Sequence, residues 1–435
     1  MTMTEKLTYM TGFGNEHSTE AIPGALPIGQ NSPQQPPFGL YSELLSGTAF
    51  TAPRSQNRRT WFYRIRPSVK SRLATQPIDS GHVCTAPDQT GQPAVTALRW
   101  NPPDFSNEKR EFLAGWKTMA TSGSAMLQRG MAAHIYTCNQ SMDRRYMQNV
   151  DGELLVVPQT GSLRFRTEAG MLEINPGEIC VIPKGYKFAV DVLDGDSRGY
   201  ICENYGSHLQ LPELGPIGSN GLANARDFQY PVAAYEEGDK ACELVVKANG
   251  QLFISSLESS PLDVVAWHGN LAPYKYDLTR FNVMGSISFD HPDPSIYTVL
   301  HSPSGIPGTA NLDFVIFPPR WLVSENTFRP PWFHSNVMSE FMGLIYGQYD
   351  SKPEGFLPGG SSLHNSMVPH GPDEEAFTNG TNKALEPEKL DQTMAFMFES
   401  RYCFTTTELA MTTGTLQTDY ADCWRSLKSR FDPAQ

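Results

Sequence analysis

Glycine and proline are spread along the whole chain. They restrict the possible secondary structure more than any other feature of the sequence. The 435 residues include 36 glycines and 34 prolines. Proline removes a backbone donor and clashes with the preceding turn of a helix, and glycine weakens a helix by its conformational freedom. Long helices cannot run through such a sequence, so we predict a mainly β fold of short strands and loops with few helices.

The strand pattern falls into two stretches with a linking segment between them. Residues 132–205 contain short runs in which apolar and polar residues alternate, separated by turns with Gly, Pro and Asn. The segment PGEICVIPKG within them resembles a strand motif of cupin barrels. The strand before this motif has no HxH pair, so this half is predicted to be a scaffold without a metal. Residues 210–280 include a Pro- and Gly-rich connector, and a strand-like pattern resumes at about residue 281. A chain of this length predicts two domains.

Two segments have helical spacing instead. The first lies near residues 108–120, where the apolar side chains on one side are Phe112, Trp116 and Met119. The second is the tail at 418–431, where the apolar side chains at helical spacing are Tyr420, Trp424, Leu427 and Phe431. We therefore predict one amphipathic helix in each segment.

Charge and composition exclude several functional classes. The formal net charge is −12 and no basic tract is present, which argues against nucleic-acid binding, because such binding needs phosphate neutralisation. No apolar run reaches the roughly 18 residues that a membrane span requires, and the opening residues have no pattern of a secretory signal. The seven cysteines are scattered without a CxxC pair, which indicates reduced thiols and a cytoplasmic location.

Histidines concentrate in one part of the chain. Six of the ten lie between residues 268 and 370. Within this part, RPPWFHSNVMSEFMGLIYGQYD places His334 and Glu340 six residues apart. On a helix this spacing points the two side chains apart, whereas on a strand an even separation puts both on one face. The apolar neighbours favour a buried strand, so we predict that both side chains converge on one metal ion.

A third ligand would come from the loop FLPGGSSLHNSMVPHGPDEE, which offers His364 and His370. Two histidines and one carboxylate on one face of an octahedron leave three open positions, the arrangement of non-heme Fe(II) oxygenases. A hydrogen-bonded His–Glu pair and a catalytic zinc site remain alternatives, although no HExxH or CxxC motif favours zinc. For the other histidines at 82, 134 and 208, structural or surface roles are expected.

Several longer segments resemble one known family. They are GFGNEH, YSELLSGTAFTAPR, NRRTWFYRIRPSV, FRPPWFHSNVMSEFMGLIYG, GFLPGGSSLHNSMVPHGPD and MAFMFES. They are similar to homogentisate dioxygenases over nearly the whole chain, and the block at 329–372 is highly specific. The resemblance implies iron(II) ligation by His334, Glu340 and His370, and so chooses His370 over His364.

The resemblance also implies roles for residues that spacing alone would leave unassigned. His291 would act as the general base, and Tyr349 would contact the substrate. Further substrate contacts would come from His370, His364 and Lys352. Without the resemblance, His291 would be read as a turn residue beside Asp290, Tyr349 as a packing residue, and Lys352 as a solvated loop lysine.

The same resemblance implies a fold, an assembly and a reaction. It implies an N-terminal β-sandwich-like domain at 1–280, a cupin-like (jelly-roll) iron-binding domain at 281–435, and a homohexamer built as a dimer of trimers. The expected reaction is the O₂-dependent cleavage of homogentisate to 4-maleylacetoacetate in tyrosine and phenylalanine catabolism. Competing hypotheses are a zinc hydrolase or metal-dependent isomerase on the same scaffold, a cupin-like binding or storage protein, and a gentisate-type dioxygenase.

Overall fold

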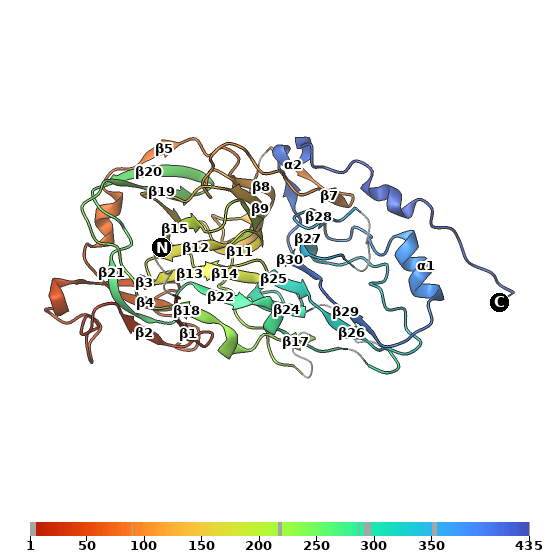
Figure 1. The fold of residues 1–435 in the computed structure, drawn as a ribbon, viewed down its shortest axis with the longest axis horizontal. Helices are drawn as coiled ribbons and strands as arrows, with labels where there is room; N and C mark the ends of the chain where they lie inside the picture. Colours follow the sequence, from red (N-terminus) through yellow and green to blue (C-terminus); the bar gives the residue numbers. More distant parts are fainter. Residues whose placement is uncertain are drawn as a thin grey trace.

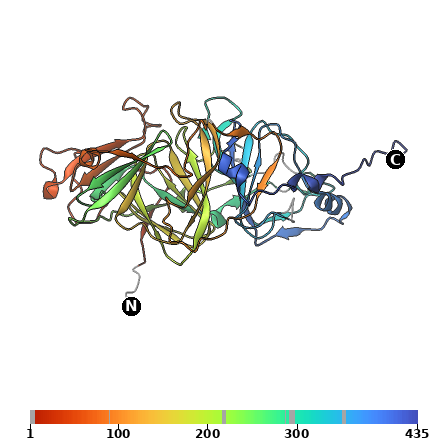
Figure 2. The ribbon, with the colours of Figure 1, turned by 90° about the horizontal axis from the view of Figure 1, so that it is seen from above.

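The computed structural model describes residues 6–88, 90–215, 220–285, 287–290, 297–349 and 355–434. Within these ranges the regular structure is mainly short β-strands, as the glycine and proline pattern predicts, and nearly all strand pairs are antiparallel, with a parallel pair at 145–149 and 243–247. Figures 1 and 2 show two groups of sheets side by side along the long axis, with the first half of the chain in one group and the last third in the other. The predicted mainly β fold is confirmed.

Three sheets form the first group. The largest has ten strands, in the order β1 (Tyr9–Thr11), β18 (Gln229–Pro231), β22 (Tyr274–Asp277), β14 (Glu178–Ile182), β11 (Glu153–Thr160), β16 (Ser197–Asn204), β9 (Arg129–Cys138), β8 (Trp116–Ser124), β31 (Thr405–Thr406) and β6 (Gln92–Pro93). The second has seven strands, in the order β13 (Gly170–Ile174), β12 (Leu163–Thr167), β15 (Lys187–Val192), β10 (Arg145–Asn149), β19 (Cys242–Ala248), β20 (Gln251–Leu257) and β5 (Gln76–Ile78). The third has the order β2 (His17–Glu20), β21 (Val264–Gly269), β4 (Arg59–Arg64) and β3 (Tyr41–Ser46).

One six-stranded sheet dominates the second group. Its order is β24 (Tyr297–Pro303), β25 (Ala310–Phe317), β30 (Met394–Ser400), β27 (Ser339–Tyr346), β28 (Ser361–His364) and β7 (Leu98–Trp100). Two short pairs complete the strands: β17 (Gly221–Leu222) with β23 (Asn282–Val283), and β26 (Arg320–Leu322) with β29 (Glu388–Leu390).

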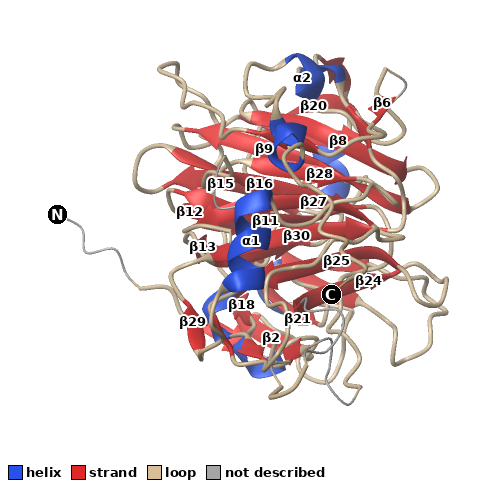
Figure 3. Cartoon of the chain, turned by 90° about the vertical axis from the view of Figure 1, so that its right-hand side faces the viewer, coloured by secondary structure: helices blue, strands red, loops and turns tan. Residues whose placement is uncertain are grey.

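Helices are few and short beside the strands (Figure 3). The α-helices are α1 (Glu374–Asn382) and α2 (Glu408–Thr412), and the 3₁₀ helices are η1 (Pro37–Gly39), η2 (Ser68–Arg72), η3 (Ala225–Asp227), η4 (Leu278–Arg280) and η5 (Tyr420–Trp424). Asp373 caps α1 by accepting a hydrogen bond from the Ala376 N–H at 2.8 Å, which satisfies one of the free donors of the first turn. In the described part of the chain, no helix combines the length and the apolarity that crossing a bilayer requires.

The helix predicted near 108–120 is wrong. Residues from Trp116 onward form β8, whose backbone pairs with β9, with Trp116 opposite Tyr136. Phe112 packs at 5.8 Å against Phe165 of the seven-stranded sheet. The helical spacing of these apolar residues is therefore overridden, because long-range strand pairing and burial between two sheets satisfy both the backbone and the side chains.

The tail helix predicted over 418–431 is reduced to one short element. Only η5 forms, and it is a 3₁₀ helix that contains Tyr420 and Trp424. Phe431, which the pattern placed on the apolar side, is 86% exposed. A helix of this length is marginal without a surface to bury its apolar side, and only the first turn of this segment finds one.

Strand pairs cross the boundary predicted between 280 and 281 at several places, among them the short pair of β17 with β23. β7 joins the six-stranded sheet beside β28, as Figure 1 shows by its orange colour among blue strands, and β31 joins the ten-stranded sheet beside β8. One continuous core also includes residues of both halves, such as Phe165 and Phe341. The division into 1–280 and 281–435 stays a prediction.

The two faces of β27 meet different surroundings. Phe341 and Ile345 belong to the main core that the sheets share, whereas Met342 and Leu344 belong to a smaller cluster on the opposite face. Glu340 precedes Met342 by two residues on the strand, so both side chains lie on one face. The six-stranded sheet therefore buries one face against the first group and uses the other to build a cavity.

Candidate metal centre

A cavity of about 470 Å³ lies on this second face of the six-stranded sheet. Its walls come from β25, β27, β28 and β30 and from the loops before and after β27 and β28. Apolar side chains from the smaller cluster, among them Met342, Phe356 and Met397, line one part of it. Charged and polar groups line the rest, including His334, Glu340, His364, His370 and Glu399.

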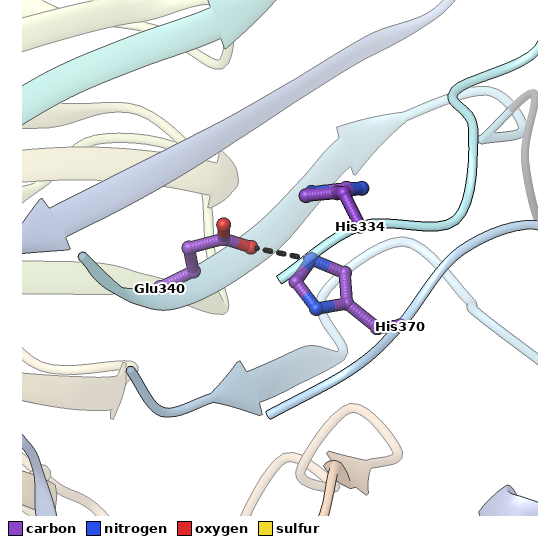
Figure 4. Close-up of side chains that lie close together, drawn as sticks. All are labelled: His334, Glu340 and His370. Atoms are coloured by element: carbon purple, nitrogen blue, oxygen red, sulfur yellow. Dashed lines mark ion pairs between the residues drawn. The ribbon is translucent and has the colours of Figure 1, made fainter. Parts of the chain in front are cut away.

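Three of these side chains form a candidate metal site. The possible ligand atoms of His334, Glu340 and His370 all lie within 4.8 Å of one another. Figure 4 shows the three side chains turned toward a common point, with the ion pair between Glu340 and His370 drawn as a dashed line. The closest pair is His370 Nε2 and Glu340 Oε2, at 3.1 Å. The sequence prediction that these three residues converge therefore agrees with the structure.

The reason for their convergence differs from the predicted one. β27 begins at Ser339, so Glu340 lies on the strand but His334 does not. His334 instead forms an isolated antiparallel bridge with His370. The prediction of one continuous strand from 334 to 340 is wrong, since Val337 is 48% exposed and the intervening residues form a bend. Two loops paired with each other present the histidines to the strand that holds the carboxylate.

The two histidine rings are oriented in the same way. Nδ1 of His334 lies 2.8 Å from the carbonyl oxygen of Trp332, and Nδ1 of His370 lies 2.9 Å from that of Val368. A carbonyl oxygen only accepts, so each Nδ1 must carry the proton and donate it. Each Nε2 is then left with a lone pair, as a metal ligand requires. On His370 this nitrogen faces a carboxylate oxygen at 3.1 Å, and the repulsion between two lone pairs is removed either by a proton, which makes the ion pair, or by a metal ion in its place.

Glu340 is held as a carboxylate despite its burial. It is 5% exposed. Burial raises the pKa of its carboxyl, but the facing imidazoles of His364 and His370 outweigh burial and hold that pKa well below its usual range. Asn336 donates a hydrogen bond from Nδ2 to Glu340 Oε1 at 3.2 Å. The carboxylate is therefore ionised and oriented, and both properties favour metal binding.

A second acid, Glu399, stands opposite Glu340 on the neighbouring strand β30. The amide of Asn336 also donates to Glu399 Oε1, at 3.0 Å, so it joins the two acids. Burial, the nearby charge of Glu340 and that of Asp313 raise the pKa of Glu399 well above its usual range. Glu399 is thus favoured in its neutral form, which limits the negative charge inside the cavity.

His364 lies beside the candidate site at the end of β28, directly across from Glu340 in the strand register. Its Nδ1 is 3.6 Å from Glu340 Oε2, and its ring stacks on that of His370 with centroids 4.2 Å apart. Its Nε2 is 3.1 Å from the hydroxyl of Tyr420. The structure therefore places His364 against two of the three candidate ligands, while its predicted contact with substrate stays a prediction.

Tyr349 lines the same cavity just beyond the end of β27. Its ring packs edge-on against Phe317 at 5.7 Å and against Phe356 at 6.1 Å. These contacts fix the ring at the wall of the cavity, where its hydroxyl can meet a bound molecule. The predicted general base His291 and the predicted substrate contact Lys352 lie outside the described residues.

The three histidines that were expected to have structural or surface roles, His82, His134 and His208, lie elsewhere in the fold. The fully buried ring of His134 bonds to Thr118 Oγ1 at 2.9 Å, and His208 contacts Glu153 at 3.1 Å. The side chain of His82 is exposed. None of these three belongs to the lining of the described cavity.

Sequence reasoning missed several residues that complete the cavity. Asn336 and Glu399 lie inside segments that resemble the known family. The strand alternation along MAFMFES could have placed Glu399 on one face with Met397. Arg99 and Tyr420 carry no local indication, because β7 and η5 reach the cavity from positions far away in the sequence. The guanidinium of Arg99 lies over the ring of Tyr420, 4.0 Å from its centroid.

Comparison with known proteins adds a family to this geometry. The family models described as the N-terminal and C-terminal parts of homogentisate 1,2-dioxygenase match residues 8–278 and 279–431. A homogentisate 1,2-dioxygenase of Rhodopseudomonas palustris strain BisB18 is 59% identical over 98% of this chain and 95% of its own length. That of strain BisA53 is 60% identical, and that of Nitrobacter hamburgensis 59%, with the same coverage.

A solved structure, a mutant oxalate decarboxylase of Bacillus subtilis, overlaps 79% of this chain and 90% of its own at 12% identity, with a TM-score of 0.32. An overlap of this quality has no bearing on function. The sequence relatives and both family models agree with each other over nearly the whole length. The chain belongs to the homogentisate 1,2-dioxygenase family.

Proposed function

We propose that this chain uses iron(II) and O₂ to open the ring of homogentisate (2,5-dihydroxyphenylacetate), giving 4-maleylacetoacetate in tyrosine and phenylalanine catabolism. Membership of the family supports the reaction, and the observation that carries it is the convergence of His334, Glu340 and His370 in one cavity. A binding or storage protein has no need for a ligand set that leaves coordination positions open, which disfavours that alternative.

The donor set fits iron(II). Two imidazole Nε2 atoms with free lone pairs and one ionised carboxylate are the ligands of the facial triad found in non-heme iron oxygenases. When bound, iron(II) supplies the Lewis acidity and the electron transfer that O₂ chemistry requires. Zinc would accept the same three ligands, so the choice of iron rests on the family and needs a direct test.

The cavity suits an aromatic acid. A volume of about 470 Å³ falls in the range of small-molecule sites. Met342, Phe356 and Met397 offer an apolar wall against which a ring can pack. Arg99, Arg320 and Arg329 also line the cavity and give it positive charge that favours a carboxylate.

We propose that the hydroxyl of Tyr349 donates a hydrogen bond to the substrate, with His364, His370 and Lys352 as further contacts. His291 is proposed as the base that takes a proton from a ring hydroxyl, which a neutral imidazole can do near pH 7. The roles of His291 and Lys352 rest on the family resemblance alone.

Three further properties are proposed on the same basis. Residues 281–435, completed by β7 from the N-terminal half, would form the catalytic unit, and residues 1–280 would form the rest of the scaffold. The chain would assemble as a homohexamer, a dimer of trimers, and act in the cytoplasm. Light scattering of the purified protein would test the assembly.

The test of the proposed function is anaerobic reconstitution of the purified protein with Fe(II) and ascorbate, followed by homogentisate and air. O₂ uptake should match homogentisate consumption, and the near-ultraviolet absorbance of the product should appear. Zn(II) in place of Fe(II) should support no uptake. Metal binding without O₂ uptake would instead favour a hydrolase or isomerase, and uptake with gentisate rather than homogentisate would reassign the substrate.

A further inference from the structure

One buried hydroxyl lies next to the candidate metal centre and contacts a histidine that faces two of its ligands. Tyr420, from η5 near the end of the chain, is 5% exposed, and its hydroxyl lies 3.1 Å from His364 Nε2. The other ring nitrogen of His364 faces Glu340 Oε2 at 3.6 Å. The plane of the same imidazole covers the ring of His370 at an angle of 5°. A short chain of contacts thus leads from Tyr420 through His364 to two of the three candidate ligands.

We propose that Tyr420 is a positioning residue of the metal centre: its hydroxyl orients His364, and His364 in turn holds Glu340 and His370 in the geometry that binds the metal. This inference rests on the proposed iron site and adds a residue to it. In this proposal Tyr420 acts through His364 and is not itself a ligand.

The direction of the hydrogen bond follows from simple chemistry. Burial raises the pKa of Tyr420, which keeps the hydroxyl protonated and able to donate, although the nearby Arg99 opposes this shift. If the hydroxyl donates to Nε2 of neutral His364, the proton of the imidazole must sit on Nδ1. Nδ1 is the nitrogen that faces the carboxylate of Glu340, so His364 then presents a donor to Glu340 Oε2. Removing the hydroxyl removes the preference for this tautomer.

Tyr420 is itself held from several sides. The guanidinium of Arg99 lies 4.0 Å from the centroid of its ring, and Arg99 stands on β7 opposite Ser362 of β28. Trp424 packs at 5.4 Å on the ring of Tyr420 and donates from its indole nitrogen to the carbonyl oxygen of Pro372 at 3.1 Å.

Pro372 follows His370 by two residues, so η5 is tied both to the strand that ends in His364 and to the loop that carries His370. Such contacts hold the phenol rigidly enough to orient an imidazole. Residues outside the ligand set that help to orient it change metal affinity or activity by roughly 10- to 100-fold when they are removed.

The experiment compares Tyr420→Phe with a matched control, Tyr186→Phe. Tyr186 is also buried, and its hydroxyl donates at 2.6 Å to the carbonyl oxygen of Leu271 in the first group of sheets. The first measurement is the Kd for Fe(II), by anaerobic competition with a coloured chelator. The second is the visible absorption spectrum of the Co(II)-substituted protein, which reports ligand geometry independently of turnover.

Tyr420→Phe should raise the Kd for Fe(II) by roughly 10- to 100-fold and change the Co(II) spectrum, while Tyr186→Phe should leave both as in the wild type. His364→Phe should raise the Kd at least as much, and adding Tyr420→Phe to it should cause no further loss, because in this proposal the effect of the hydroxyl on the metal passes through that imidazole. The His364→Phe arm keeps the inference testable if Tyr420→Phe does not fold.

A folded Tyr420→Phe protein with the wild-type Kd for Fe(II) and the wild-type Co(II) spectrum would overturn the inference. A double variant whose loss of Fe(II) affinity equals the sum of the two single losses would also overturn it. A wild-type protein that binds no Fe(II) at all would instead count against the proposed function. The two failures are therefore distinguishable.

Discussion

The backbones of His334 and His370 are joined by two reciprocal hydrogen bonds. The N–H of His334 donates to the carbonyl oxygen of His370 at 2.9 Å, and the N–H of His370 donates to that of His334 at 3.1 Å. This pairing brings their ring centroids to 4.2 Å. The distance between two candidate ligands is thus set by the main chain, and only the third, Glu340, comes from a regular strand.

Loss of either histidine should abolish metal binding. We expect His334→Ala and His370→Ala to be purified without stoichiometric iron and to show no O₂ uptake with homogentisate, because each removes one of three ligands. Metal content by mass spectrometry and an oxygen electrode would check this. His82→Ala, at an exposed position, should retain both. A variant that keeps one iron per chain would remove that residue from the ligand set.

A methyl group at Gly371 should disturb the same pair of loops. A Cβ at this position would lie 2.5 Å from Cδ1 and 2.8 Å from Cα of Phe333, the neighbour of His334. Gly371→Ala must therefore push the two loops apart, and displacement of about 1 Å at a reacting site costs on the order of 100-fold in rate. The measurement is kcat together with iron content.

Gly414→Ala is the control for this change, since a Cβ there meets no atom within 4 Å. Equal activity of the two alanine variants would show that the spacing of the paired loops tolerates more movement than their contacts suggest.

Removing the hydroxyl of Tyr349 should weaken substrate binding. Tyr349→Phe preserves the ring that packs on Phe317 and Phe356 but removes the proposed donor. A hydrogen bond to a charged group contributes about 1.5–3 kcal/mol, so KM should rise by roughly 10- to 100-fold with iron content unchanged. Steady-state kinetics with homogentisate would measure it.

Tyr346→Phe, at the end of β27, offers a comparison, because Tyr346 packs against the main core and does not line the cavity. Its KM should stay close to that of the wild type. If Tyr349→Phe also keeps the wild-type KM, Tyr349 serves packing alone.

Far from the cavity, the stability of the first group of sheets should depend on a buried charge cluster. Nζ of Lys247 lies 2.7 Å from both Glu203 and Asp151, and all three side chains are buried. Removing one partner of a buried ion pair typically costs about 3–5 kcal/mol. Glu203→Gln should lower the free energy of unfolding in urea at pH 7 by that amount, whereas Glu237→Gln, at an exposed position, should change it little.

The same cluster predicts a dependence on pH. Burial raises the pKa of Glu203, but the charge of Lys247 and the nearby ring of His134, 3.5 Å away, outweigh it and lower the pKa to about 2, from an ordinary value of 4.5. A lowered pKa in the folded state means that the stabilisation by ionised Glu203 is complete above pH 4.5 and declines as the pH falls toward 2. The difference in stability between wild type and Glu203→Gln should therefore shrink over this interval. A constant difference would show that Glu203 does not titrate there.

The candidate ligands were predictable from the sequence, but the reason for their meeting was not. The even spacing of His334 and Glu340 suggested one shared strand, yet the strand begins only at Ser339. Spacing arguments describe neighbours on one regular element, and they fail where a loop turns back within a few residues. His364 and His370 were both plausible ligands, and the geometry separates them because His364 faces Tyr420 with one nitrogen and Glu340 with the other.

The amino-acid sequence by itself determined the β-rich fold, through its glycines, prolines and short alternating runs, and it determined which side chains could hold a metal. The tertiary structure alone decided how those side chains are oriented and which partners support them. Arg99 and Tyr420 come from opposite ends of the chain and meet at the cavity only because β7 and η5 pack beside β28. Local sequence patterns record the preferences of one element, whereas contacts between distant elements depend on how whole sheets pack and which hydrogen bonds remain to be satisfied.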